Sequence, residues 1–290
     1  MYSIEKELKI LRQFVKPEHM DNSEGWRCYS EDELSAAEER LHIKLPPPIR
    51  EVYLYMADLM LPFYLRPLEL VHWEKDYLGF FLDADNGIVI GIKRDDLSDG
   101  IYKWEETDPE GIAWEYEEDF ETAYSEHDKA SLREIAKKYQ EYWDKLNANQ
   151  EYGPKQITKM ENEPRFNHTI DGFSLFLVIH ALCEVAEMER TSTPNEPTIY
   201  SSEVFLGHTS EYFQDLDRRV RADFVPLSDH PELLAQDMPM QMVYVHKNPD
   251  ALLIQRDDWI NCELLTKSVP EQSFIEKVQE QTGLKFRCDF

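Results

Sequence analysis

The spacing of hydrophobic residues predicts three helices in the N-terminal part of the chain. Residues 4–15 carry apolar side chains three or four positions apart, as on one face of a short helix. Residues 30–33 (SEDE) form a capping box, in which the serine hydroxyl and the last carboxylate each satisfy a free backbone amide. An apolar stripe over residues 34–41 predicts the second helix. The prolines at 46–48 end that helix and begin a third one over residues 49–56.

Two hydrophobic segments, residues 78–82 and 88–92, predict an antiparallel hairpin. Asn86-Gly87 lies between them and supplies the positive φ angles of a tight turn. Further strands are expected near residues 101–104 and 112–116.

Helical spacing returns in the middle of the chain. Residues 129–146 have the apolar repeat of an amphipathic helix, and residues 152–167, which contain two prolines, are expected to form a loop. Residues 173–188 predict a helix that is apolar on nearly every side, and such a helix is expected in the interior of the fold.

The last hundred residues predict shorter elements. They are a strand at 203–207, a charged helix at 211–221, a hairpin of 242–245 with 252–254, and a closing helix at 273–283 capped by Gly283. Helices and antiparallel hairpins without regular βαβ alternation indicate an α+β fold, with an antiparallel or mixed sheet packed against helices. We expect a lead helix and linker over residues 1–24 and a core domain over 25–190. An α+β extension over 191–290 is expected to pack on the same core.

Charge is the unusual property of this composition. Hydrophobic residues make up 42% of the 290 residues, enough for a substantial core, but 58 Asp+Glu face only 31 Lys+Arg, which gives a formal net charge of −27. Such a surface repels nucleic-acid phosphates and anionic lipids and attracts basic partners. The longest apolar stretch, residues 173–182, contains Ser174 and His180 and is too short to cross a bilayer. We therefore expect a cytoplasmic protein that binds neither nucleic acid nor membrane.

Catalytic and metal-binding signatures are missing from the sequence. The four cysteines are far apart, no His/Cys pair has the spacing of metal ligands, and the common nucleotide-binding and hydrolase motifs do not occur. Paired carboxylates are so frequent that no pair stands out as an acid and a base. We predict a protein without cofactor, metal or catalytic activity. An enzyme with an unrecognised polar pocket is a competing hypothesis.

One segment combines acidic and aromatic residues in an unusual density. From Trp104 to Asp128 the chain has 11 acidic residues and no Lys or Arg, with five aromatic residues among them. One interpretation is a solvated acidic face whose aromatic rings point into the core. The other is a recognition surface for a basic protein, in which carboxylates steer the partner and aromatic residues anchor it. Its candidate contact residues are Trp104, Glu105, Glu106, Asp108, Trp114, Glu115, Tyr116, Glu117, Glu118 and Asp119.

The segment from residue 30 to residue 56 (SEDELSAAEERLHIKLPPPIREVYLYM) resembles the opening of the SUKH superfamily. That family begins with an acidic helix, a Leu-Pro motif and a helix that starts with an aliphatic or aromatic residue and a basic one. The residues that match are Glu38, Leu41, Leu45, Pro46, Ile49 and Arg50. The hairpin at Asn86-Gly87 and the buried helix led by residues 169–173 look like later elements of the family.

The resemblance implies an α+β fold and a function in protein binding. Its best-represented members are bacterial immunity proteins, which bind and neutralise a cognate polymorphic toxin delivered between cells. Because the active site of a nuclease is positively charged, an acidic protein is well suited to cover it. We therefore predict an immunity protein whose partner is a basic toxin domain. The alternative is a non-catalytic regulatory scaffold, like the fungal cell-wall-synthesis regulators that share the fold family.

Overall fold

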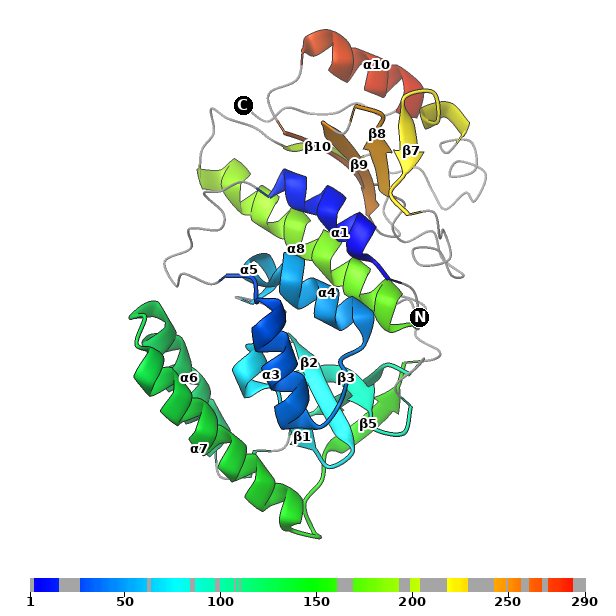
Figure 1. Ribbon diagram of the computed structural model, residues 1–290. Helices are drawn as coiled ribbons and strands as arrows, with labels where there is room; N and C mark the ends of the chain where they lie inside the picture. The colour runs from blue at the N-terminus through cyan, green and yellow to red at the C-terminus, as the bar shows by residue number, and fades with distance from the viewer. Residues whose placement is uncertain are drawn as a thin grey trace. The chain divides into compact units, whose positions relative to one another are not determined.

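The chain forms two compact units with an α+β fold, described by a computed structural model (Figure 1). The first unit comprises residues 1–8, 15–163 and 168–181, and the second comprises 9–14, 164–167 and 182–290. The structure describes residues 3–15, 27–61, 64–83, 87–96, 100–106, 108–109, 111–160, 169–192, 199–203, 218–228, 243–248, 250–256, 261–267 and 271–283.

The N-terminal helices follow the predicted pattern closely. They are α1 (Glu5–Leu11), a 3-10 turn η1 (Arg12–Phe14), α3 (Glu31–Leu41), α4 (Pro47–Tyr55) and α5 (Ala57–Met60). The capping box is confirmed, because Ser30 accepts a hydrogen bond from the backbone of Glu33 and the Glu33 carboxylate accepts one from the backbone of Ser30. His42 adopts a left-handed conformation (φ 54°) that ends α3.

The first unit contains an antiparallel sheet of five strands. In spatial order they are β1 (Trp73–Glu74), β2 (Tyr77–Asp83), β3 (Ile88–Lys93), β4 (Tyr102–Glu105) and β5 (Lys155–Lys159). The predicted hairpin is confirmed in β2 and β3, where Leu82 pairs with Val89, and Gly87 has a φ of 62°. Residues 84–86 of its turn lie outside the described part of the chain.

Both edges of this sheet are irregular. At β1, the Asn147 side chain accepts a hydrogen bond from the Lys75 amide and donates one to the Trp73 carbonyl. Strand β5 lies where the sequence predicted only a loop. Its side chains are mostly exposed, so its sequence lacks the alternation of hydrophobic and polar residues that predicts a strand. Gln156 within it has a positive φ of 53°.

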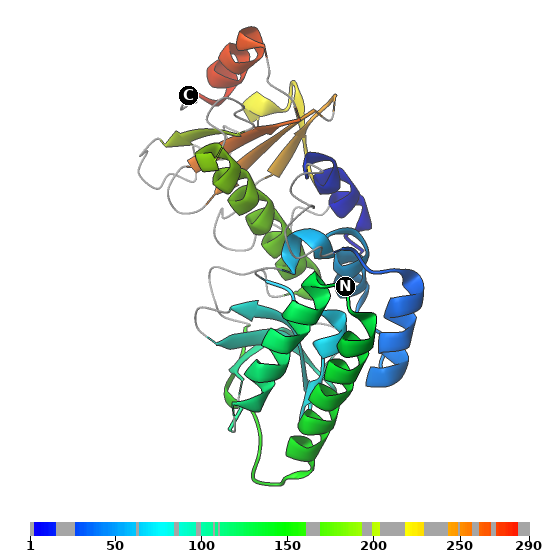
Figure 2. The same ribbon diagram turned by 90° about the vertical axis from the view of Figure 1, so that its left-hand side faces the viewer.

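A helical hairpin runs beside the sheet. It consists of α6 (Ile112–Ser125) and α7 (Lys129–Ala148), and Figure 2 shows the two helices side by side next to the strands. The strand expected at residues 112–116 is therefore wrong. The helix begins there because the Asp108 carboxylate accepts a hydrogen bond from the Ala113 amide, and because Ala113 and Phe120 bury one face of α6. Helix α7 begins at Asp128, whose carboxylate caps two backbone amides.

The predicted apolar helix is confirmed and longer than expected, as α8 (Ile170–Ser192). Its first half belongs to the first unit, where the Phe173 ring lies edge-on to Phe81 with 5.5 Å between ring centres. Among the described residues, no helix is long and apolar enough to cross a membrane.

The second unit has its own antiparallel sheet of five strands, in the order β6 (Ile199–Glu203), β10 (Asn261–Thr266), β9 (Ala251–Arg256), β8 (Val243–His246) and β7 (Phe224–Pro226). The predicted hairpin of 242–245 with 252–254 is confirmed by the pairing of β8 with β9. The closing helix is α10 (Gln272–Thr282), and Gly283 caps it with a φ of 72°. Residues 204–217, which include most of the strand expected at 203–207 and of the helix expected at 211–221, lie outside the described part.

Candidate functional site

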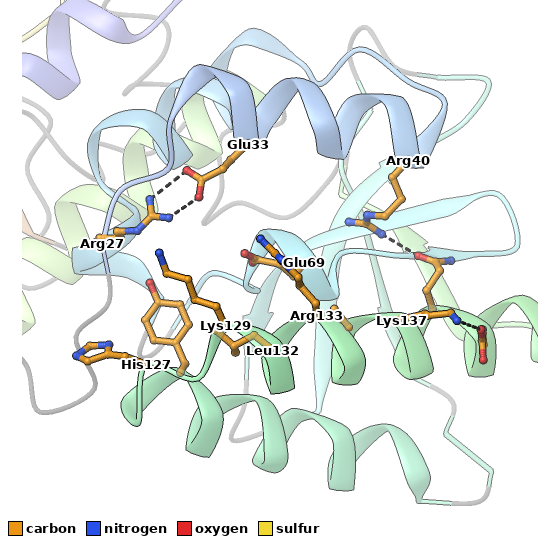
Figure 3. Close-up of a pocket in the computed structure, with 13 residues that line it drawn as sticks. Arg27, Glu33, Arg40, Glu69, His127, Lys129, Leu132, Arg133 and Lys137 are labelled. Carbon is orange, nitrogen blue, oxygen red and sulfur yellow. Dashed lines mark hydrogen bonds and ion pairs between the residues drawn. The ribbon is translucent and has the colours of Figure 1, made fainter.

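A cavity of about 720 Å³ opens in the first unit between α3 and α7 (Figure 3). Helix α7 contributes Lys129, Arg133 and Lys137, which are four positions apart and therefore share one face of the helix. Arg40 reaches the cavity from α3. A basic cavity thus forms in a strongly acidic chain.

The cations of this cavity differ in what neutralises them. Arg27 forms a two-pronged ion pair with Glu33, which lowers the pKa of that carboxyl to about 2. Lys137 lies 3.6 Å from Glu141, but both side chains are exposed and such a pair is weak. Within the described residues, Lys129 and Arg133 have no ion pair.

Arg40 is held without a carboxylate among the described residues. It donates hydrogen bonds to the Leu68 and Val71 carbonyls, each at 2.8 Å, and to the Gln140 side chain at 2.7 Å. Burial lowers the pKa of Arg40 because the charged guanidinium loses water. The nearby Glu69 carboxylate accepts a hydrogen bond from the Tyr29 hydroxyl at 2.8 Å, and burial raises the pKa of Glu69.

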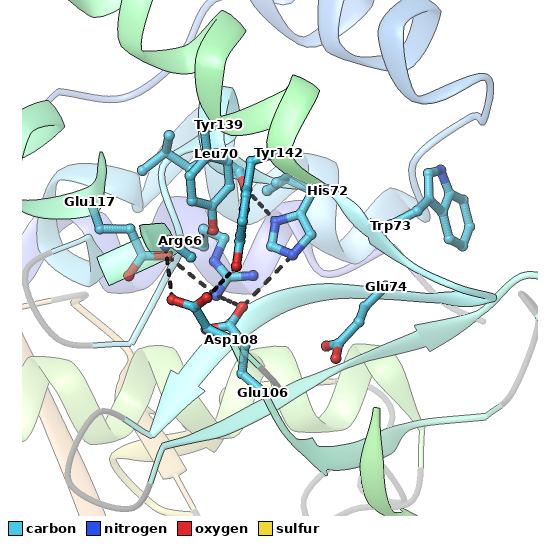
Figure 4. Close-up of polar contacts among 12 residues, drawn as sticks. Arg66, Leu70, His72, Trp73, Glu74, Glu106, Asp108, Glu117, Tyr139 and Tyr142 are labelled. Atoms are coloured by element: carbon cyan, nitrogen blue, oxygen red, sulfur yellow. Dashed lines mark hydrogen bonds and ion pairs between the residues drawn. The ribbon is translucent and has the colours of Figure 1, made fainter. Parts of the chain in front are cut away.

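A second polar cluster lies buried where α6 and α7 meet the sheet (Figure 4). Its centre is Arg66, which is only 2% exposed. The Arg66 guanidinium donates to Glu106 at 2.6 Å and lies 3.6 Å from Glu117. Glu117 also accepts a hydrogen bond from the Tyr139 hydroxyl of α7 at 2.8 Å. This cluster fixes α6 to the interior through a carboxylate that points inward.

The environment shifts the protonation of two members of this cluster. Burial raises the pKa of Glu117 to about 7, although the charge of Arg66 acts in the opposite direction and that of Glu106 adds to the rise. Burial and the charge of Arg66 hold the pKa of His72 well below its usual range. Since the His72 Nδ1 faces the Leu70 carbonyl at 2.9 Å, this nitrogen carries the proton of the neutral ring.

Four residues of the predicted contact surface form hydrogen bonds or ion pairs with other residues of the first unit. Trp104 is buried and donates to Glu74 at 2.5 Å. Glu106 and Glu117 bind in the Arg66 cluster. Asp108 caps α6 and accepts a further hydrogen bond from the Tyr142 hydroxyl.

The other predicted residues lie closer to solvent. Tyr116 is half-buried and lies edge-on to Tyr139 and Tyr142 of α7. Glu105 is exposed and accepts a hydrogen bond from Gln156. Glu115, Glu118 and Asp119 are exposed on α6, and the side chain of Trp114 lies outside the described part.

Three of these residues form what we call the α6 acidic face: Glu115, Glu118 and Asp119. Glu118 and Asp119 follow Glu115 by three and four positions, so both lie next to it on one side of the helix. None of them forms an ion pair with another described residue. Their carboxylates are available to an external cation.

The sequence reasoning missed the basic cavity. The signal was present, because Lys129, Arg133 and Lys137 recur every four residues in a segment that was predicted to be helical. It was obscured by the overall acidity, and by Arg40, which lies far away in the sequence. In the described part of the chain, no group of three His, Cys, Asp or Glu side chains is placed to hold a metal ion.

Comparison with known protein families, with curated proteins and with solved structures finds no match to this chain.

Proposed function

We propose that this chain is a non-catalytic binding protein that neutralises a basic partner protein, as an immunity protein neutralises a toxin. The observation that carries the proposal is the α6 acidic face, in which three exposed carboxylates form no ion pair with another described residue. The net charge of −27 adds a long-range attraction for a basic surface. The resemblance of residues 30–56 to the SUKH superfamily supports the same class of function.

The fold presents this face rigidly. Glu117 is anchored by Arg66 and Tyr139 on the opposite side of α6, and the Asp108 carboxylate fixes the start of the helix. Neighbouring Glu117 and Glu118 thus have different roles, the first in the interior and the second in solvent. Binding to a rigid helix costs less conformational entropy than binding to a loop, because the helix is already ordered before the partner binds.

A toxin that acts on nucleic acid is the partner class that suits this face best. Its active site must be positively charged to hold phosphates, so carboxylates can occupy the same positions and exclude the substrate. The electrostatic attraction speeds association and becomes weaker as salt is added.

The test is capture of toxin domains encoded beside the gene, followed by association kinetics. The informative variant is Glu115→Lys/Glu118→Lys/Asp119→Lys. Its matched control is Glu271→Lys/Glu276→Lys/Glu280→Lys, which makes the same change of net charge on exposed residues at α10 of the second unit.

We expect the α6 variant to associate at least about tenfold more slowly and to lose protection against the toxin. The α10 control should remain within about threefold of the unaltered chain, because it has the same net charge as the α6 variant but keeps the α6 acidic face intact. The proposal fails if no neighbouring toxin is captured, or if the two variants are impaired equally.

A further inference from the structure

The basic cavity between α3 and α7 has an excess of positive charge that the fold does not use. Arg27 is neutralised by Glu33, whereas Arg40, Lys129 and Arg133 form no ion pair with a described carboxylate, although the charge of Glu69 acts on Arg40. These three cations belong to a chain in which acidic residues outnumber basic ones by 58 to 31. Their concentration around one cavity therefore needs a reason other than composition.

Arg40 is the least exposed cation of the cavity. Its guanidinium is partly buried, and its described partners are two carbonyls and one amide, which do not neutralise its charge. Withdrawing this charge from water is costly, and a bound anion would offset part of that cost. The charge of the nearby Glu69 acts on Arg40, but among the described residues no ion pair joins the two.

The charge count favours a phosphate over a single carboxylate. The lining has five Lys or Arg residues and three glutamates, and its excess of two positive charges matches a phosphate, while one carboxylate supplies only one negative charge. Lys129 and Arg133 project from adjacent turns of α7, about 6 Å apart along the helix axis, so a phosphate group can meet both.

The cavity also has an apolar wall. Leu132 and Ala136 lie between the basic residues on the same face of α7, and Tyr124 contributes an aromatic side chain. The volume of about 720 Å³ is within the range of sites for small organic ligands. A ligand with a planar, weakly polar body and a phosphate would use both parts of this lining.

We infer that this cavity binds a nucleotide, with its phosphates on Lys129, Arg133 and Arg40 and its base against Leu132, Ala136 and Tyr124. The net acidity of the chain does not prevent this, because charges more than about 8 Å away are largely screened at physiological salt. A nucleic-acid strand, by contrast, extends along the acidic surface and is repelled. The inference is independent of the proposed function, since the α6 acidic face contributes none of these residues.

The test is titration calorimetry of the full chain at physiological ionic strength with adenosine diphosphate, pyrophosphate and adenosine as separate ligands. The informative variant is Lys129→Gln/Arg133→Gln. The matched control is Lys138→Gln/Lys145→Gln, which removes two exposed cations of α7 that do not line the cavity.

We expect saturable binding of adenosine diphosphate at one site, at least about tenfold weaker in the Lys129→Gln/Arg133→Gln variant and within about twofold in the control. Pyrophosphate and adenosine should each bind at least about tenfold more weakly than the nucleotide. All replaced residues are exposed or half-exposed, and a thermal melt verifies that each variant is folded. The inference is overturned by no saturable binding up to about 1 mM, by equal affinity for pyrophosphate and the nucleotide, or by equal losses in both variants.

Discussion

The buried carboxyl of Glu117 makes a pH-dependent contribution to stability that one substitution can isolate. Its pKa rises from an ordinary 4.5 to about 7 in the folded chain because burial disfavours the charged form. The charged or titratable groups around it are Arg66, Glu106, Glu121 and Tyr139. Of these, Arg66 favours the ionised carboxylate and the two other glutamates disfavour it.

The sign of the effect follows from the raised pKa. Below about pH 4.5, Glu117 is protonated in both the folded and the unfolded chain, and its contribution is fully present. As the pH rises to about 7, the unfolded chain releases the proton while the folded chain retains it, so stability is lost. A difference of about 2.5 between the two pKa values corresponds to about 3 kcal/mol. Since the side chain is 25% exposed, we expect about 2 kcal/mol between pH 5 and pH 8.

The perturbation is Glu117→Gln, which replaces the carboxyl by a neutral amide of similar shape. Because glutamine does not titrate, the unaltered chain should lose about 2 kcal/mol relative to this variant between pH 5 and pH 8. Any constant effect of the substitution cancels in that comparison. The contributions of titrating groups that do not interact with Glu117 cancel as well.

The assay is urea unfolding at pH 5, 6, 7 and 8, followed by tryptophan fluorescence. Five of the six tryptophans (residues 26, 73, 104, 114 and 143) belong to the first unit, so the signal reports mainly on the unit that contains Glu117. Glu118→Gln is the control, since its carboxylate is exposed. A free-energy difference between the unaltered chain and Glu117→Gln that stays constant with pH, or that moves in the opposite direction, would refute this reasoning.

Three further substitutions test the packing of the first unit. Gly91→Ala places a Cβ 1.9 Å from the backbone oxygen of Leu78 and should lower the free energy of unfolding by about 3 kcal/mol. Gly153→Ala is its control in thermal melts and should have almost no effect, because the nearest atom to the new Cβ is 3.9 Å away. Ser30→Ala removes the cap of α3 and should cost about 1 kcal/mol in urea unfolding; an unchanged midpoint would mean that the cap contributes nothing. Glu74→Ala leaves two buried donors unpaired and should cost about 3 kcal/mol, and a loss below about 1 kcal/mol would contradict that account.

Local signals in the sequence were sufficient for many elements. The SEDE capping box, the Asn86-Gly87 hairpin and the Gly283 cap each act within a few residues. Such signals constrain the backbone directly, so they can be recognised without knowledge of the tertiary structure.

Elements that depend on tertiary contacts were harder to predict. Residues 112–116 alternate like a strand, yet they form a helix because Asp108 caps it and α7 packs beside it. Strand β5 has no hydrophobic alternation, since its partner is the backbone of β4 and its side chains face solvent. In both cases the deciding partner lies outside the segment.

The same limit applies to the candidate site. Glu117 and Glu118 are chemically identical neighbours, and only the position of Arg66 makes one interior and the other exposed. Similarly, the basic face of α7 is evident once α7 is predicted to be a helix, but the contribution of Arg40 depends on the packing of α3. Net charge alone indicated an acidic surface and gave no sign of a basic cavity within it.

The edges of the first sheet restrict how this unit can associate with other chains. At one edge, Asn147 occupies hydrogen-bonding groups that a further strand would need. At the other, Gln156 interrupts the extended backbone, and Lys155 and Lys159 place positive charges at the ends of β5. Growth by strand addition, the route to edge-to-edge aggregates and fibrils, is therefore disfavoured. Recognition through the exposed side chains of helices has no such restriction, and substitutions there can change the choice of partner without altering the backbone.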